Sequence, residues 1–278
     1  MKVLRASSVT EAIKLQQSHN GHYLAGGTDI MVGVNSEKFQ PKCLIDLSRC
    51  QELYGIVEEE AAVKIGALTT FTELEKSETI QQFFPALSKA AASVGGPQIR
   101  NRGTVGGNIC NASPAADTVP ALVALHAVAV VEGSNGQRQL PVEKLLTAPR
   151  QTCLSEDEIV KELILPKKGS VSDFMKVGKR NALAISSINM AIAVVKEERK
   201  IQEIRVAVGS AAPTVRNCVR AAACLKEGGV SAIEEAKRIL MEEIAPIDDR
   251  WATAEYRRMV ACNMLESLAV ALMEETNV

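Results

Sequence analysis

Two short glycine-rich segments are the parts of this chain whose residue types and spacing could do chemistry. Residues 24–30 read Leu-Ala-Gly-Gly-Thr-Asp-Ile, and residues 104–117 read Thr-Val-Gly-Gly-Asn-Ile-Cys-Asn-Ala-Ser-Pro-Ala-Ala-Asp. Each segment combines paired glycines with a hydroxyl and a carboxylate. Because glycine has no Cβ, successive glycines let several backbone N–H groups approach one anion. Two such loops predict a long ligand with a phosphate centre and a polar heterocycle, which a dinucleotide fits.

The two commonest phosphate-binding motifs do not match these loops. A parallel-sheet dinucleotide fold shows Gly-x-Gly-x-x-Gly between a strand and a helix, and Gly26-Gly27-Thr28 lacks that spacing. A P-loop has Lys and then Ser or Thr after its glycines, and neither segment contains lysine. The sequence therefore predicts phosphate capture mainly by backbone N–H groups.

Length and composition limit the classes of protein to which this chain can belong. A chain of 278 residues with 46% hydrophobic residues can bury a substantial core and form two domains. A net charge of −1 and 3% aromatic residues argue against nucleic-acid binding. The first residues carry no apolar signal segment, and no apolar run reaches the length of a membrane span, so we expect a cytoplasmic protein without membrane contact.

The seven cysteines are odd in number and irregularly spaced, without a Cys-x-x-Cys pair. This pattern indicates reduced thiols and predicts no iron–sulfur cluster or zinc site in the chain. No nucleophile–base pair is evident either, so we expect no catalytic residue and no metal site here.

Hydrophobic periodicity predicts the elements that must position the loops. We expect helices at residues 9–17, 84–94, 120–126, 141–146, 215–225, 230–243 and 254–275, and a capped helix start at Thr70. We expect strands at residues 23–25, 43–47, 127–132, 158–165, 188–196 and 201–210, a hairpin from 53–57 and 63–66, and a loop over 97–108.

The break at residues 167–170, Lys-Lys-Gly-Ser, predicts a boundary between two domains. We expect an α+β fold. Residues 1–167 would form the ligand-binding domain, in two subdomains of about 1–55 and 56–167. Residues 168–278 would form a C-terminal domain with a small antiparallel sheet and helices.

Residues 25–30 and 103–117 resemble the two FAD loops of the molybdenum hydroxylase flavoproteins. These are the medium subunits of xanthine dehydrogenase, carbon monoxide dehydrogenase and related purine or aldehyde hydroxylases. The resemblance covers nearly the whole chain. It implies one bound FAD and a two-loop FAD-binding domain of the xanthine dehydrogenase and vanillyl-alcohol oxidase type.

The resemblance also implies which residues contact the cofactor. The first loop would hold the FAD pyrophosphate through backbone N–H groups, and the second would cradle the other phosphate and the ribityl chain. Asp117 would accept from cofactor hydroxyl or amine groups, Val160 matches a backbone contact, and Lys176 matches a lysine near the flavin. The implied set is Tyr23, Leu24, Ala25, Gly26, Gly27, Thr28, Asp29, Ile30, Thr104, Gly106, Gly107, Asn108, Asn111, Asp117, Val160 and Lys176.

The residue types alone leave other roles open. Asp29 and Asp117 could be helix caps, and Asn108 and Asn111 could be turn residues with local hydrogen bonds. Lys176 could be an ordinary solvated lysine.

The resemblance implies an electron-transfer subunit of a heterotrimer. A ferredoxin-like 2Fe–2S subunit would deliver electrons, NAD or another acceptor would take them from FAD, and a large molybdopterin-binding subunit would oxidise the substrate. Purine or xanthine is the first expectation for that substrate, with aldehyde, nicotinate and carbon monoxide open. The alternative is a self-contained flavin oxidoreductase of the wider two-loop FAD superfamily, with its own substrate pocket.

Overall fold

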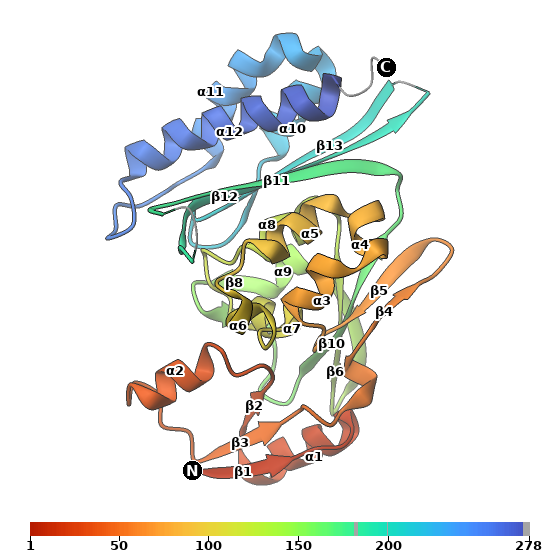
Figure 1. Cartoon of the computed structure of the whole chain (residues 1–278), viewed down its shortest axis with the longest axis vertical. Coiled ribbons are helices and arrows are strands. Elements are labelled where there is room, and N and C mark those ends of the chain that lie inside the picture. Colours follow the sequence, from red (N-terminus) through yellow and green to blue (C-terminus); the bar gives the residue numbers. More distant parts are fainter. Residues whose placement is uncertain (181–182, 199, 275–278) are drawn as a thin grey trace.

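The computed structural model describes residues 1–180, 183–198 and 200–274, and its elements are stacked in layers along the long axis of the molecule (Figure 1). At one end lies a parallel three-stranded sheet with the strand order β1-β3-β2. Its elements are β1 (Lys2–Arg5), α1 (Val9–His19), β2 (His22–Leu24), α2 (Ile30–Asn35) and β3 (Cys43–Asp46). A helix was expected over residues 9–17, and α1 begins where Ser8 accepts a hydrogen bond from the Glu11 N–H and ends before Asn20, which is in the left-handed conformation.

The middle of the molecule is a five-stranded sheet with the order β4-β5-β10-β6-β7, flanked by short helices. Its strands are β4 (Ile56–Glu58), β5 (Ala62–Gly66), β6 (Val128–Gly133), β7 (Gly136–Pro141) and β10 (Ile159–Pro166). Its helices are η1 (Gln51–Leu53), α3 (Phe71–Lys76), α4 (Glu78–Phe83), α5 (Pro85–Ala92), α6 (Pro97–Arg100), α7 (Val105–Cys110), α8 (Thr118–Ala124) and α9 (Val142–Leu145). A small hairpin follows, from β8 (Leu146–Ala148) and β9 (Gln151–Thr152).

The remaining layer is an antiparallel four-stranded sheet, β11-β12-β13-β14, with helices on both faces (Figure 1). Its elements are β11 (Ser170–Gly178), β12 (Ser186–Glu197), β13 (Lys200–Gly209), β14 (Arg216–Asn217), α10 (Val219–Gly228), η2 (Gly229–Ala232), α11 (Ile233–Glu243) and α12 (Ala254–Glu274). Helices α10 and α12 cover one face, and α5 and α8 of the middle layer cover the other. The middle layer and the four-stranded sheet therefore share a large apolar junction, to which Phe174 and Ala193 of the sheet contribute.

The mixed fold agrees with the α+β expectation, but some segments differ from their predicted structure, and two of these differences have a clear physical cause. Residues 97–108, expected to be a loop, form α6 and the start of α7. Two adjacent glycines disfavour a helix locally. Here the Thr104 hydroxyl caps α7 by accepting from the Gly107 N–H at 3.2 Å. The Val105 and Gly106 N–H groups also donate to the carbonyls of Thr69 and Ala67.

The second difference lies after β13, where a helix was expected over residues 215–225. Arg216 and Asn217 instead pair with Val208 and Ala207 as strand β14, and α10 begins only at Val219. Pairing with a distant strand therefore overrides the local helical pattern. In the described ranges no helix combines the length and apolar character that crossing a membrane requires.

Candidate functional site

The first glycine loop connects β2 to α2. The parallel pairing of β2 with β3 fixes its start, where the Leu24 carbonyl accepts from the Leu47 N–H at 3.0 Å. Within the described residues, the five consecutive backbone N–H groups of residues 25–29 donate to no other group of the chain. Unpaired backbone donors of this kind are what a phosphate-binding loop presents to its ligand.

Two glycines give this loop its shape. A Cβ at Gly26 would lie 1.8 Å from the carbonyl oxygen of Arg102, so only glycine permits this approach to the backbone before the second loop. Gly27 has φ +76°, a left-handed conformation that L side chains rarely adopt. The structure thus brings the two predicted loops into direct contact, although they are far apart in the sequence.

The second loop differs from the first in how its donors are used. Thr104, Gly106 and Gly107 lie in or next to the first turn of α7, and the Gly106 and Gly107 N–H groups are already bonded. The Asn108 side chain is also engaged, because its Oδ1 accepts from the Thr118 hydroxyl at 2.7 Å. The second loop therefore forms a rigid wall of the site, while the first supplies the free backbone donors.

Arg150 joins the two loops. It lies in the turn between β8 and β9, and its Nη1 donates to Asp29 Oδ2 at 3.0 Å and to Asn111 Oδ1. Its backbone N–H donates to the Ala112 carbonyl at 2.9 Å. Asp29 occupies the N-cap position of α2, but its side chain makes no capping hydrogen bond, so its carboxylate is directed to Arg150 rather than to the helix.

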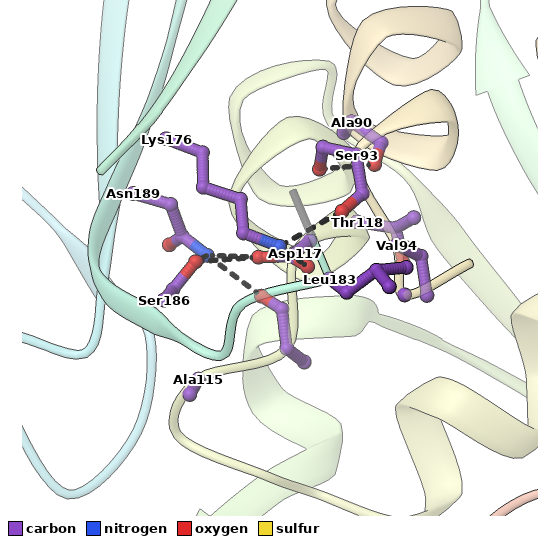
Figure 2. Close-up of polar contacts among 12 residues, drawn as sticks. Ala90, Ser93, Val94, Ala115, Asp117, Thr118, Lys176, Leu183, Ser186 and Asn189 are labelled. Carbon is purple, nitrogen blue, oxygen red and sulfur yellow. Dashed lines mark hydrogen bonds and ion pairs between the residues drawn. The ribbon is translucent and has the colours of Figure 1, made fainter. Parts of the chain in front are cut away.

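Asp117 lies at the junction with the four-stranded sheet, in a buried polar cluster (Figure 2). Its Oδ2 accepts from Lys176 Nζ at 2.5 Å, and its Oδ1 accepts from the Ser186 hydroxyl at 2.6 Å and from Asn189 Nδ2 at 3.0 Å. Lys176 Nζ also donates to the Ser93 carbonyl at 2.8 Å. Asp117 stands at the N-cap of α8 without a capping bond. Its side chain therefore bonds residues of the four-stranded sheet and does not cap the helix.

Tyr23 and Val160 lie behind the loops. The Tyr23 hydroxyl donates to the Asp157 carbonyl at 2.9 Å. Burial, reinforced by the nearby Asp157 carboxylate, raises the pKa of Tyr23, so this hydroxyl stays protonated. Val160 is buried in β10 beside a bulge, and α7 packs against that strand. Both residues therefore support the loops from within the fold.

Sequence reasoning missed several residues of this site. Arg150, Ser186 and Asn189 contact residues that were predicted, but none of them lies in a recognisable motif. Only the proximity of Ser186 and Asn189 to Lys176 along the chain could have drawn notice. Within residues 1–180, 183–198 and 200–274, no three His, Cys, Asp or Glu side chains come together as a metal-ligand group.

Two glycine loops in contact, the first with free backbone donors, lie beside the packing of the middle layer on the four-stranded sheet and define a flavin-binding protein of the two-loop class. Residues 1–168 match the FAD binding domain in molybdopterin dehydrogenase, and residues 173–271 match the CO dehydrogenase flavoprotein C-terminal domain. The chain therefore belongs to the FAD-binding medium subunits of the molybdenum hydroxylase family.

Individual relatives agree with this assignment. The chain is 32% identical over 260 residues to the xanthine dehydrogenase FAD-binding subunit of Escherichia coli O157:H7, covering 91% of this chain and 89% of that one. It is 42% identical over 176 residues to the nicotinate dehydrogenase FAD-subunit of Eubacterium barkeri, covering 62% and 60%. Among solved structures, carbon monoxide dehydrogenase from Hydrogenophaga pseudoflava matches with a TM-score of 0.93 at 30% identity, over 99% of this chain and 98% of that one.

Proposed function

We propose that this chain is the electron-exit subunit of a molybdenum hydroxylase complex. Bound FAD would supply reversible two-electron chemistry, taking electrons from a 2Fe–2S partner subunit and passing them to NAD or another acceptor. A molybdopterin-binding subunit would oxidise the substrate. The observation that carries the proposal is the run of five free N–H donors at residues 25–29, which suits a diphosphate and needs no lysine.

Different residues of the chain would bind the phosphates and the flavin ring. Residues 23–30 would bind the pyrophosphate, with the Thr28 hydroxyl as an added donor. Thr104, Gly106, Gly107, Asn108 and Asn111 would wall the ribityl and phosphate region, and Val160 would contribute a backbone contact. We propose a division near residues 167 and 168, which separates this phosphate-binding part from the part that meets the flavin ring.

The flavin ring would lie at the domain junction beside Asp117 and Lys176. Leu183 and Ile185 are 57% and 47% exposed there, although both are large apolar residues. Leu183 lies against Gly96, where a Cβ would come within 2.8 Å of Leu183 Cδ2. An apolar surface beside a buried polar pair suits an isoalloxazine, which has apolar faces and polar edges.

For the substrate of the complex we propose a purine such as xanthine. The match with the xanthine dehydrogenase subunit over nearly all of this chain supports this choice. The carbon monoxide dehydrogenase chain has the same fold, and the nicotinate dehydrogenase subunit is similar in sequence over 176 residues, so the substrate pocket would belong to the partner subunit.

Purification of the chain with and without its partners tests the proposal. The isolated chain should show flavin absorption bands and reduce artificial dyes with NADH, but it should not oxidise xanthine, purines or aldehydes. Activity on one of these should appear only when an iron–sulfur subunit and a molybdopterin subunit are added. Hydroxylation by this chain alone, with mass spectrometry showing no other subunit, would contradict the proposal.

A further inference from the structure

We propose that Arg150 is a positioning residue of the flavin site. Its side chain holds the two glycine loops together and neutralises the charge of Asp29. The inference deepens the proposed function and rests on it for the identity of the ligand. Arg150 is distant from both loops in sequence, and its side-chain bond to Asp29 spans 121 residues.

The backbone of Arg150 is fixed before its side chain acts. The residue has φ +63° in the turn between β8 and β9, and its N–H donates to the Ala112 carbonyl, which belongs to a residue with φ +46°. Two left-handed residues joined by a backbone hydrogen bond set the direction from which the guanidinium leaves the turn. The guanidinium then reaches Asp29 of the first loop and Asn111 of the second with one nitrogen.

The first loop has little else to hold its far end. Helix α2, which follows Asp29, contains no buried residue, and Figure 1 shows it set to one side of β2. Among the described residues, Arg150 is the only side chain that bonds the Asp29 carboxylate. Removal of Arg150 would therefore free the side of the loop that carries the unpaired N–H groups.

Charge gives Arg150 its second role. A diphosphate held by residues 25–29 would lie close to the Asp29 carboxylate, and like charges at short range repel. The guanidinium offsets that carboxylate without entering the loop itself. Both side chains are more than half exposed, at 55% for Arg150 and 59% for Asp29, so solvent screening keeps the effect moderate.

The test compares FAD dissociation constants of flavin-stripped variants, measured by quenching of FAD fluorescence at low and high salt. Arg150→Ala should weaken FAD binding about three- to tenfold at low salt, and less at high salt. Alanine has the same left-handed strain as arginine at this position, so the comparison isolates the guanidinium. Arg150→Gln repeats the test with a longer side chain, in case the alanine variant folds poorly.

The charge role predicts a specific rescue. Asp29→Asn in the Arg150→Ala background should restore at least half of the lost affinity, and Arg150→Lys should bind FAD within about twofold of wild type. Arg220→Ala, which removes an equally exposed ion pair with Glu242 on the C-terminal helices, is the matched control and should leave FAD affinity unchanged. The thermal midpoints of the flavin-stripped variants should lie close together.

Two outcomes would overturn the inference. Equal FAD affinity of wild type and Arg150→Ala would show that the hydrogen bonds of Arg150 to the two loops do not affect FAD binding. A loss that neither Asp29→Asn nor Arg150→Lys reduces would assign Arg150 a purely structural role. Failure of the wild-type chain itself to bind FAD would instead contradict the proposed function, so the two failures are distinguishable.

Discussion

Asp117 and Lys176 form a buried ion pair across the domain junction, with Oδ2 and Nζ 2.5 Å apart and side-chain exposures of 9% and 12%. The pair lies where the flavin ring is proposed to bind, and each partner has further neutral partners in Ser186, Asn189 and the Ser93 carbonyl. These residues thus join the two domains of the chain itself, in addition to any contact they make with the cofactor.

Asp117→Ala should therefore lower the free energy of unfolding of the flavin-stripped chain by about 3 kcal/mol, because it leaves the Lys176 ammonium buried without a counter-charge. Lys176→Met should cost less, since Asp117 keeps the Ser186 and Asn189 donors. Urea unfolding of both variants measures this difference. The control is Lys89→Met, which breaks the more exposed junction pair with Asp173 and should cost under about 1 kcal/mol. Equal losses for all three variants would contradict a special role for the buried pair.

Gly27→Val should abolish flavin retention. The substitution places a β-branched side chain in a left-handed conformation within the loop of free N–H donors. Flavin content per chain, read from the visible spectrum after gel filtration, measures the effect. Gly136→Val is the control, because that glycine also has positive φ, with no atom within 4 Å of its Cβ position. Full FAD content in Gly27→Val would show that the pyrophosphate lies elsewhere.

Gly26→Ala should act on folding as well as on flavin. Its Cβ would overlap the Arg102 carbonyl at 1.8 Å, and this neighbour is backbone that cannot rotate away. We expect a loss of about 3 kcal/mol in the flavin-stripped chain, toward the upper end of overpacking costs. Chemical denaturation of the stripped protein checks this value. An alanine variant as stable as wild type would mean that the two loops are not in contact in solution.

His126 should make the stability of the junction depend on pH. Its Nε2 lies 2.5 Å from Glu203 Oε1, and its Nδ1 lies 3.2 Å from Arg205 Nη1. Burial, followed by the charges of Arg205 and Lys168, lowers the pKa of His126 although Glu203 opposes them. The folded protein then binds fewer protons than the unfolded chain, so this contribution to stability is present above the unfolded pKa and lost as pH falls.

His126→Asn tests this dependence, because asparagine tolerates the left-handed φ of +56° at this position. Urea midpoints of the wild type should fall between about pH 7.5 and about pH 5.5, on either side of the ordinary histidine pKa, and the fall should be shallower in the variant. The remaining slope reports carboxylates such as Glu203. Identical slopes for the two proteins would exclude His126 as a source of the pH dependence.

Local signals predicted much of the scaffold. The Thr70 and Glu73 capping box begins α3 as expected, and α1 forms where a helix was expected over residues 9–17. These signals succeed because caps and turns depend on residues within one helical turn of each other. The segment 97–108 failed for the opposite reason. The start of α7 depends on the Thr69 and Ala67 carbonyls, which accept from the Val105 and Gly106 N–H groups, and those partners come from a separate part of the chain.

The sequence by itself determined the cofactor class, because the paired glycine loops are short, contiguous and specific to a ligand held by backbone N–H groups. Only the tertiary structure decided which side chains surround those loops. Arg150 meets Asp29 across 121 residues, and Lys176 meets Asp117 across 59. Such contacts depend on how loops close and layers pack, and a periodic pattern of apolar residues carries no record of which polar side chains will face each other across a junction.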